Sequence, residues 1–149
     1  MYELDRLEDA LASYDMAIKH NPTNSEAFNG KGACLDDLNR HEDALASYDM
    51  AIKHNPSYSD AFYNKGRCLY QQNRLDEALV SYDMAIKHNP ANSAAYNNKG
   101  NCLRDLNRLE EALASYDMAI KHNPNNVNAL NNRKLLLKQL KSKSNCKQQ

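Results

Sequence analysis

The chain has 149 residues, and its 19 lysines and arginines balance its 19 aspartates and glutamates. This zero formal net charge argues against a protein that mainly binds nucleic acid, because such proteins usually carry a surplus of basic residues. No apolar run is long enough to cross a bilayer, and no signal peptide is recognisable. We therefore predict an intracellular, cytoplasmic protein that contacts neither nucleic acid nor a membrane.

A ten-residue sequence, Ser-Tyr-Asp-Met-Ala-Ile-Lys-His-Asn-Pro, occurs four times without change. The copies begin at Ser13, Ser47, Ser81 and Ser115, so the period is 34 residues. A fixed period of this length is the sequence signature of a repeat protein, in which each unit contacts only its neighbours. The chain is therefore predicted to be a stack of similar units.

Each unit has the pattern of two helices joined by a short turn. Residues 5–20 carry apolar side chains at spacings of three and four, which is typical of a helix with one buried face. Asn21-Pro22 ends this helix, because the residue before a proline is disfavoured in helical geometry. Alternation of apolar and polar residues, the signal of a strand, is absent. The predicted helices are 5–20, 24–38 and 41–54, a helix pair within 58–88, a second pair within 92–122, and a last helix at 126–141.

A glycine recurs in the middle of the first helix of each pair, as Gly32, Gly66 and Gly100. Glycine inside a helix costs about 1 kcal/mol relative to alanine, so a packing reason is expected, such as the close approach of the partner helix. The last helix has Lys134 at this place, which predicts a terminal helix with one face on the stack and one in water. The polar segment 142–149 after it is predicted to be disordered.

The cysteines and histidines give no sign of a disulfide, a metal site or a catalytic site. Cys34, Cys68 and Cys102 recur with the period, so they lie about 10 Å apart, beyond the roughly 7 Å that a disulfide spans. We expect three small, buried, reduced side chains there, and an exposed free thiol at Cys146. Four of the five histidines recur just before Asn-Pro. A polar or cationic side chain is favoured at such a helix end, so no metal or cofactor is predicted.

The repeated positions resemble those of the tetratricopeptide repeat (TPR) family, whose 34-residue helix–turn–helix units carry characteristic aromatic, glycine, alanine and proline residues. The matching residues are Phe28, Gly32, Leu35, Ala44, Tyr48, Ala51 and Pro56 in the first full unit; Phe62, Gly66, Leu69, Ala78, Tyr82, Ala85 and Pro90 in the second; and Tyr96, Gly100, Leu103, Ala112, Tyr116, Ala119 and Pro124 in the third. The lysine before each glycine (Lys31, Lys65 and Lys99) departs from the large apolar residue that is usual in the family.

The resemblance covers residues 1–140 and implies an all-α fold: a right-handed TPR superhelix, or α-solenoid, of antiparallel helix pairs with about eight helices. Its predicted parts are a half unit 1–24, full units 25–58, 59–92 and 93–126, and a C-terminal capping helix 127–141.

In TPR arrays the first helices of successive units line the concave face, where extended peptides usually bind. Asn64, Asn98 and Asn132 are spaced by 34 residues, and we expect them to form a column similar to the asparagine ladder of the O-linked N-acetylglucosamine transferase. An asparagine amide both donates and accepts, so it can pair with a peptide backbone without reading side chains. Gly30 breaks the column in the first unit. The predicted peptide-binding residues are Asn29, Tyr63, Asn64, Arg67, Asn97, Asn98, Asn101, Arg104, Asn131 and Asn132.

The carboxylate clamp of TPR co-chaperones is not expected, because the corresponding residues supply too few cations for its charge-assisted hydrogen bonds. The sequence thus predicts a non-catalytic scaffold or adaptor that binds an extended peptide or a partner protein. Two alternatives stay open. The chain is a targeting segment of a larger enzyme, or it self-assembles head to tail, with the last helix of one molecule completing the lone first helix of the next. Lys134 argues against self-assembly.

Overall fold

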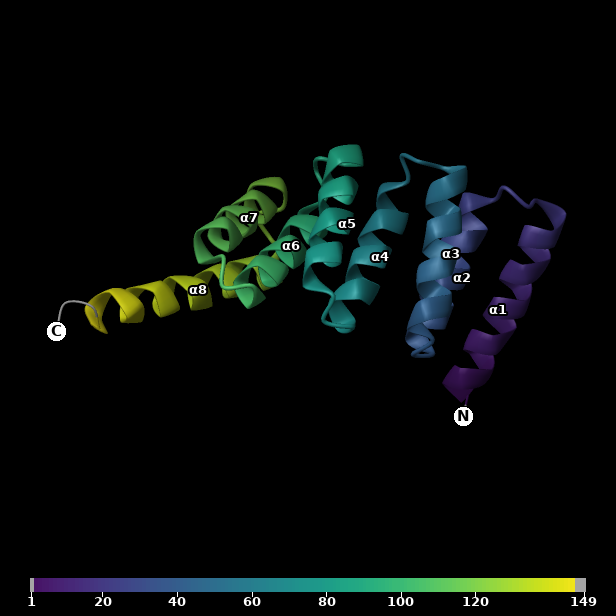
Figure 1. The fold of residues 1–149 in the computed structure, drawn as a ribbon, viewed down its shortest axis with the longest axis horizontal. Coiled ribbons are helices and arrows are strands. Elements are labelled where there is room, and N and C mark those ends of the chain that lie inside the picture. The colour runs from purple at the N-terminus through teal and green to yellow at the C-terminus, as the bar shows by residue number, and fades with distance from the viewer. Residues whose placement is uncertain (1, 147–149) are drawn as a thin grey trace.

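The computed structural model describes residues 2–146, with side chains over residues 4–143. This part of the chain folds into eight helices and contains no strand, which confirms the predicted all-α class. Figure 1 shows the helices stacked side by side, from α1 at the N-terminal end to α8 at the C-terminal end. The helices are α1 (Tyr2–His20), α2 (Ser25–Asp37), α3 (His41–His54), α4 (Ser59–Gln71), α5 (Leu75–His88), α6 (Ser93–Asp105), α7 (Leu109–His122) and α8 (Val127–Cys146).

The two helices of each full unit are joined by a tight turn at an asparagine. Asn39, Asn73 and Asn107 have φ angles of 58°, 59° and 59°, in the left-handed region that asparagine tolerates better than most residues. In the first turn the Arg40 N–H donates to the Leu35 carbonyl at 2.8 Å, and the Asn39 N–H donates to the Asp36 carbonyl at 2.9 Å. These are the two hydrogen bonds of a Schellman motif, which satisfies the carbonyl groups at the end of a helix.

The stack curves toward the first helices of the units. In sequence order α2, α4, α6 and α8 each contact the next, whereas across residues 2–146 the second helices α3, α5 and α7 make no such contacts with one another. The first helices are therefore closer together, and they line the concave side of the solenoid.

A tyrosine from each second helix fills the core of its own unit. Tyr48, Tyr82 and Tyr116 are all at most 1 % exposed. A Cβ atom placed on Gly66 would lie 2.7 Å from the Tyr82 ring. A Cβ atom on Gly32 would lie similarly close to the Tyr48 ring, and one on Gly100 to the Tyr116 ring. The expected close approach of the partner helix is thus made by its aromatic side chain.

The lysine before each glycine forms an ion pair between consecutive units. Lys65 Nζ lies 2.6 Å from Asp49 Oδ1, on the preceding second helix. Lys31 pairs with Asp15, Lys99 with Asp83, and Arg133 with Asp117 in the same way. The departure from the family pattern therefore places a cation opposite the aspartate of the repeated ten-residue sequence.

The repeated histidines stack on aromatic rings. The ring centroids of His54 and Phe28 are 5.6 Å apart, and His88 and His122 stack in the same way on Phe62 and Tyr96. These histidines lie in the last turns of their helices, as the sequence predicts. Each packs on an aromatic ring of the first helix in its own unit.

Two details differ from the sequence predictions. Helix α8 continues to Cys146 instead of ending at residue 141, so part of segment 142–149, predicted to be disordered, is helical. The Cys146 side chain lies outside the described side chains. Cys34 is only partly buried, whereas Cys68 and Cys102 are buried as expected. Among the described helices, none combines the length and the apolar character needed to cross a membrane.

Candidate peptide-binding groove

A pocket of about 270 Å³ lies on the concave side, where α4 and α6 are neighbours. The pocket is lined by Arg67, Tyr70 and Gln71 from α4, Asn98 and Asn101 from α6, and Tyr82 from α5. Arg67, Asn98 and Asn101 belong to the set of peptide-binding residues predicted from the sequence. The structure therefore gathers three of the predicted residues, from two neighbouring units, around one cavity.

Two donor groups in this pocket have no partner of their own. The Tyr82 hydroxyl is buried and makes no hydrogen bond of normal geometry within the described residues, although the Asn98 side chain lies close enough to it to oppose the rise of the Tyr82 pKa on burial. Arg67 is exposed and forms no ion pair with any described side chain. Buried polar groups almost always have hydrogen-bond partners. The Tyr82 hydroxyl has no exposed surface, so the exposed Arg67 guanidinium is the unpaired group of this pocket that a ligand can reach.

A difference between the second and third units accounts for the missing acceptor of Tyr82. In the third unit the equivalent Tyr116 hydroxyl donates to Asn101 Oδ1 at 2.8 Å. The second unit has Arg67 at the position of Asn101, and a guanidinium group has no acceptor. The sequence analysis identified Tyr82 only as a residue of the family pattern and missed this difference, although the Asn-to-Arg change between units is the signal.

The asparagine column exists, but its side chains are used to join the units. Asn64 Nδ2 donates to Asn29 Oδ1 at 3.1 Å, and Asn98 Nδ2 donates to the Tyr63 hydroxyl at 3.3 Å. Asn132 Nδ2 donates to Asn97 Oδ1 at 3.0 Å and to Asn101 Oδ1 at 3.1 Å. An asparagine amide has two donor hydrogens, so these bonds reduce its capacity for a peptide. Gly30 breaks the column because the Tyr14 ring of α1 occupies the space of a Cβ atom there.

The remaining predicted residues differ in their access to a ligand. Asn97 is 6 % exposed and serves the contact between units, whereas Asn131 is exposed on α8. Arg104 is occupied, because its guanidinium lies 2.9 Å from the Asp105 carboxylate. The Tyr70 hydroxyl donates to the same carboxylate at 2.6 Å. Burial, followed by this bond to Asp105, raises the pKa of Tyr70 to about 12, so Tyr70 stays neutral at physiological pH.

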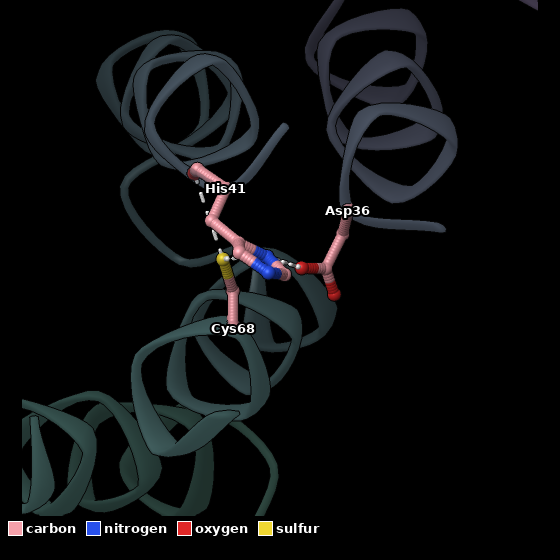
Figure 2. Close-up of side chains that lie close together, drawn as sticks. All are labelled: Asp36, His41 and Cys68. Atoms are coloured by element: carbon pink, nitrogen blue, oxygen red, sulfur yellow. Dashed lines mark hydrogen bonds and ion pairs between the residues drawn. The ribbon is translucent and has the colours of Figure 1, made fainter. Parts of the chain in front are cut away.

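A second cluster of polar side chains lies outside the groove, between the first two full units. Figure 2 shows Asp36, at the end of α2, and Cys68, on α4, on either side of His41, the first residue of α3. His41 Nδ1 lies 2.9 Å from Asp36 Oδ1 and 3.9 Å from Cys68 Sγ. Burial and the nearby Asp36 raise the pKa of the Cys68 thiol to about 12, which excludes a reactive thiolate at neutral pH in this arrangement. The sequence predicts no cluster of this kind.

Family models described as "Tetratricopeptide repeat" match residues 2–53, 35–86 and 93–126. The chain belongs to the tetratricopeptide repeat family. Members of this family are in general non-catalytic modules for protein–protein interaction. No curated relative matches the sequence.

Several solved TPR structures share the fold. A crystal structure of MamA has a TM-score of 0.80 at 20% identity, and the match covers 90% of this chain and 73% of that chain. The first TPR of Spaghetti (RPAP3) bound to the HSP90 peptide SRMEEVD has a TM-score of 0.75 at 21% identity, covering 78% and 92% of the two chains. The Arabidopsis OM64 TPR domain has a TM-score of 0.75 at 25% identity, covering 77% and 95%.

Proposed function

We propose that this TPR chain is a protein-binding scaffold whose concave face holds an extended peptide across α4 and α6. The observation that carries the proposal is the pocket that contains the exposed, unpaired Arg67 guanidinium beside the side chains of Asn98 and Asn101. A guanidinium group only donates, so an acidic side chain of the peptide pairs with Arg67 through charge-assisted hydrogen bonds. Asn98 and Asn101 line the same pocket. Their amide oxygens and one Asn98 N–H bond to other side chains of the chain, and their remaining N–H groups donate to the peptide backbone in this proposal.

The acidic peptide SRMEEVD bound by the Spaghetti TPR supports this chemistry, but the proposed mode of binding differs from a carboxylate clamp. In the two possible registers the clamp positions here are Asn29, Ala33, Asn64, Ala94 and Asn98, or Tyr63, Arg67, Asn98, Asn128 and Asn132. Arg67 is the single cation among them. We therefore expect the pocket to bind an internal acidic side chain and to be indifferent to the terminal carboxylate of the peptide.

Fluorescence polarisation with three labelled peptides tests this proposal. The peptides are SRMEEVD, its C-terminal amide, and a variant in which both glutamates are glutamine. We expect the first two peptides to bind with the same affinity. The third should bind roughly 10- to 100-fold more weakly, because it lacks the carboxylate for the charge-assisted hydrogen bonds. Arg67→Ala should weaken the binding of SRMEEVD by a similar factor, because it removes the cation of the pocket.

Arg108→Ala is the matched control, because Arg108 is exposed, pairs with Glu111 at the start of α7, and does not line this pocket. The affinity of the Arg108→Ala variant for SRMEEVD should equal that of the unmodified chain. Binding that disappears on amidation would point to a carboxylate clamp. Failure of SRMEEVD to bind, or equal affinity in the Arg67 variant, would contradict the assignment of the pocket.

A further inference from the structure

Two side chains in the first two full units replace a leucine of the repeat, and a third, Asp36, stands at a position that varies among the units. His41 stands where the other units have Leu7, Leu75 and Leu109. Gln72 stands where Leu4, Leu38, Leu106 and Leu140 occur, and Asp36 corresponds to Tyr70 and Arg104. In a chain whose units are otherwise so similar, replacement of leucine by a polar residue at inward-facing positions is unusual. These departures therefore point to a local requirement for polar groups.

These three side chains gather around Cys68, two of them in contact with its sulfur atom and Asp36 in contact with His41. His41 Nδ1 lies 3.9 Å from Sγ, and Gln72 Nε2 donates to Sγ at 3.6 Å. Asp36 Oδ1 lies 2.9 Å from His41 Nδ1. One ligand atom from each of Asp36, His41 and Cys68 lies within 4.8 Å of the others. Asp36 and Cys68 are buried, and the His41 side chain is 29% exposed, so the cluster is open to solvent on the histidine side.

The geometry distinguishes a metal site from a catalytic triad. In a triad the nucleophile and the carboxylate contact opposite nitrogens of the imidazole ring, so that a proton passes between them. Here both partners face Nδ1 (Figure 2), which leaves no second nitrogen for the proton relay. An ion placed between the three groups instead satisfies Nδ1, the carboxylate oxygen and the sulfur together.

We propose that Asp36, His41 and Cys68 form a binding site for a single divalent transition-metal ion, with Zn²⁺ as the best fit. Thiolate, imidazole and carboxylate are the ligands that Zn²⁺ takes in proteins, at about 2.0–2.3 Å in a tetrahedron. Ligand atoms at such distances are separated by roughly 3.3–3.6 Å, close to the separations of 2.9 Å and 3.9 Å around Nδ1. Only small side-chain movements are needed to close the site.

The surroundings supply the outer contacts that a metal site needs. The Gln72 amide donates to the sulfur, a contact that a metal-bound thiolate retains. The His41 side chain is partly exposed, so the site is accessible to water or to a ligand from a partner protein. Because the three ligands come from α2, α3 and α4, the ion would fasten the first full unit to the second beside the proposed peptide groove.

Cobalt provides a direct test, since Co²⁺ occupies zinc sites and gives a thiolate-to-metal charge-transfer absorption when cysteine is a ligand. The experiment uses the full chain with Cys146→Ser, under reducing conditions, titrated with Co²⁺ and then with Zn²⁺. We expect a charge-transfer band that saturates at about one equivalent of Co²⁺ and is removed by Zn²⁺. Zn²⁺ should also raise the melting temperature, because it binds only the folded state.

The repeat offers matched variants. Cys68→Ser and His41→Leu should abolish the band, and the latter keeps the fold because leucine occupies that place in the other units. Cys102→Ser should leave the band unchanged, since Tyr70 and Leu75 stand around Cys102 in place of aspartate and histidine. Helical circular dichroism checks that each variant is folded.

A gain of function makes the test stricter. The triple change Tyr70→Asp, Leu75→His and Leu106→Gln reproduces the cluster around Cys102, and we expect it to bind a second equivalent of Co²⁺. The proposal is overturned if the unmodified chain gives no thiolate band, if the band survives in Cys68→Ser, or if it is lost in Cys102→Ser. A folded triple variant that binds no second ion also counts against it.

Discussion

The central glycine of each first helix faces the ring of a tyrosine on its partner helix. At Gly66 a Cβ atom would lie 2.7 Å from the buried Tyr82 ring, closer than real Cβ contacts allow. Tyr82 is fully buried, so its ring cannot turn into open space. We therefore expect Gly66→Ala to lower the free energy of unfolding by about 1–3 kcal/mol, the usual cost of overpacking.

The sign of this change is the informative result. Alanine is about 1 kcal/mol better than glycine inside an unconstrained helix, so a glycine without a packing role would give stabilisation. Urea unfolding followed by circular dichroism measures the difference. A more stable Gly66→Ala variant would show that the Tyr82 ring moves freely and that the repeat does not need glycine at this place.

The sequence predicted that the partner helix closely approaches the glycines, but not that a tyrosine ring makes the contact. The period places Gly66 and Tyr82 on facing helices, whereas the direction of the ring depends on side-chain packing. The same reason explains why the stacking of His54 on Phe28 was not predicted. Spacing identifies the face of a helix, and the contact within that face is decided by the rotamer.

The turn between the two helices of each full unit depends on an asparagine in the left-handed conformation. Asn73 has a φ angle of 59°. A β-branched residue there incurs a backbone cost of roughly 1–2 kcal/mol, while glycine adopts this conformation without steric penalty. We expect Asn73→Val to destabilise the chain by about that amount, and Asn73→Gly to change its stability by less than about 0.5 kcal/mol. Equal stability of the two variants in urea would contradict the role assigned to this turn.

The asparagine column illustrates what the repeat period can and cannot predict for a helix face. The period correctly identifies Asn64, Asn98 and Asn132 as equivalent residues. However, Asn64 bonds to Asn29, which is 35 positions earlier. Neighbours across units are set by the twist of the stack, so the sequence predicted free amides where the structure has bonds between units. The pocket beside them was predicted in part, through Arg67, Asn98 and Asn101.

For the whole molecule, the period predicted the helices within a few residues, because each unit repeats the same start and stop signals. The cluster around Cys68 was not predicted, since it combines residues from three segments that are adjacent only in space.

The two ends of the stack also differ. Head-to-tail assembly would bring a tyrosine such as Tyr14 of a second molecule onto Lys134, where the inner units have glycine. The lysine side chain occupies the space that such a ring needs, so we expect this contact to be disfavoured.

The N-terminal helix should be the least stable part of the stack. Within residues 2–146, helix α1 contacts only α2, whereas α3 contacts both α2 and α4. Tyr14, Ala10 and Ala17 are partly exposed, although the equivalent Tyr48, Ala44 and Ala51 are at most 1 % exposed. In a solenoid, stability is approximately a sum of unit terms and nearest-neighbour terms, so a helix with one neighbour opens more readily. We expect the amide hydrogens in the middle of α1 to exchange at least about tenfold faster than those of α5, a difference of about 1.4 kcal/mol in opening free energy.

Hydrogen exchange followed by mass spectrometry measures this difference, and the repeat supplies a control. Replacing residues 1–6 by a copy of residues 93–108 gives α1 a first helix of its own, because Leu7 is equivalent to Leu109. In that chain exchange in α1 should slow toward the rate of α5, since its exposed face is then covered. If α1 already exchanges as slowly as α5 in the unmodified chain, its stability does not depend on nearest-neighbour packing. If the added helix leaves the exchange of α1 unchanged, the exposed face of Tyr14 is not the cause.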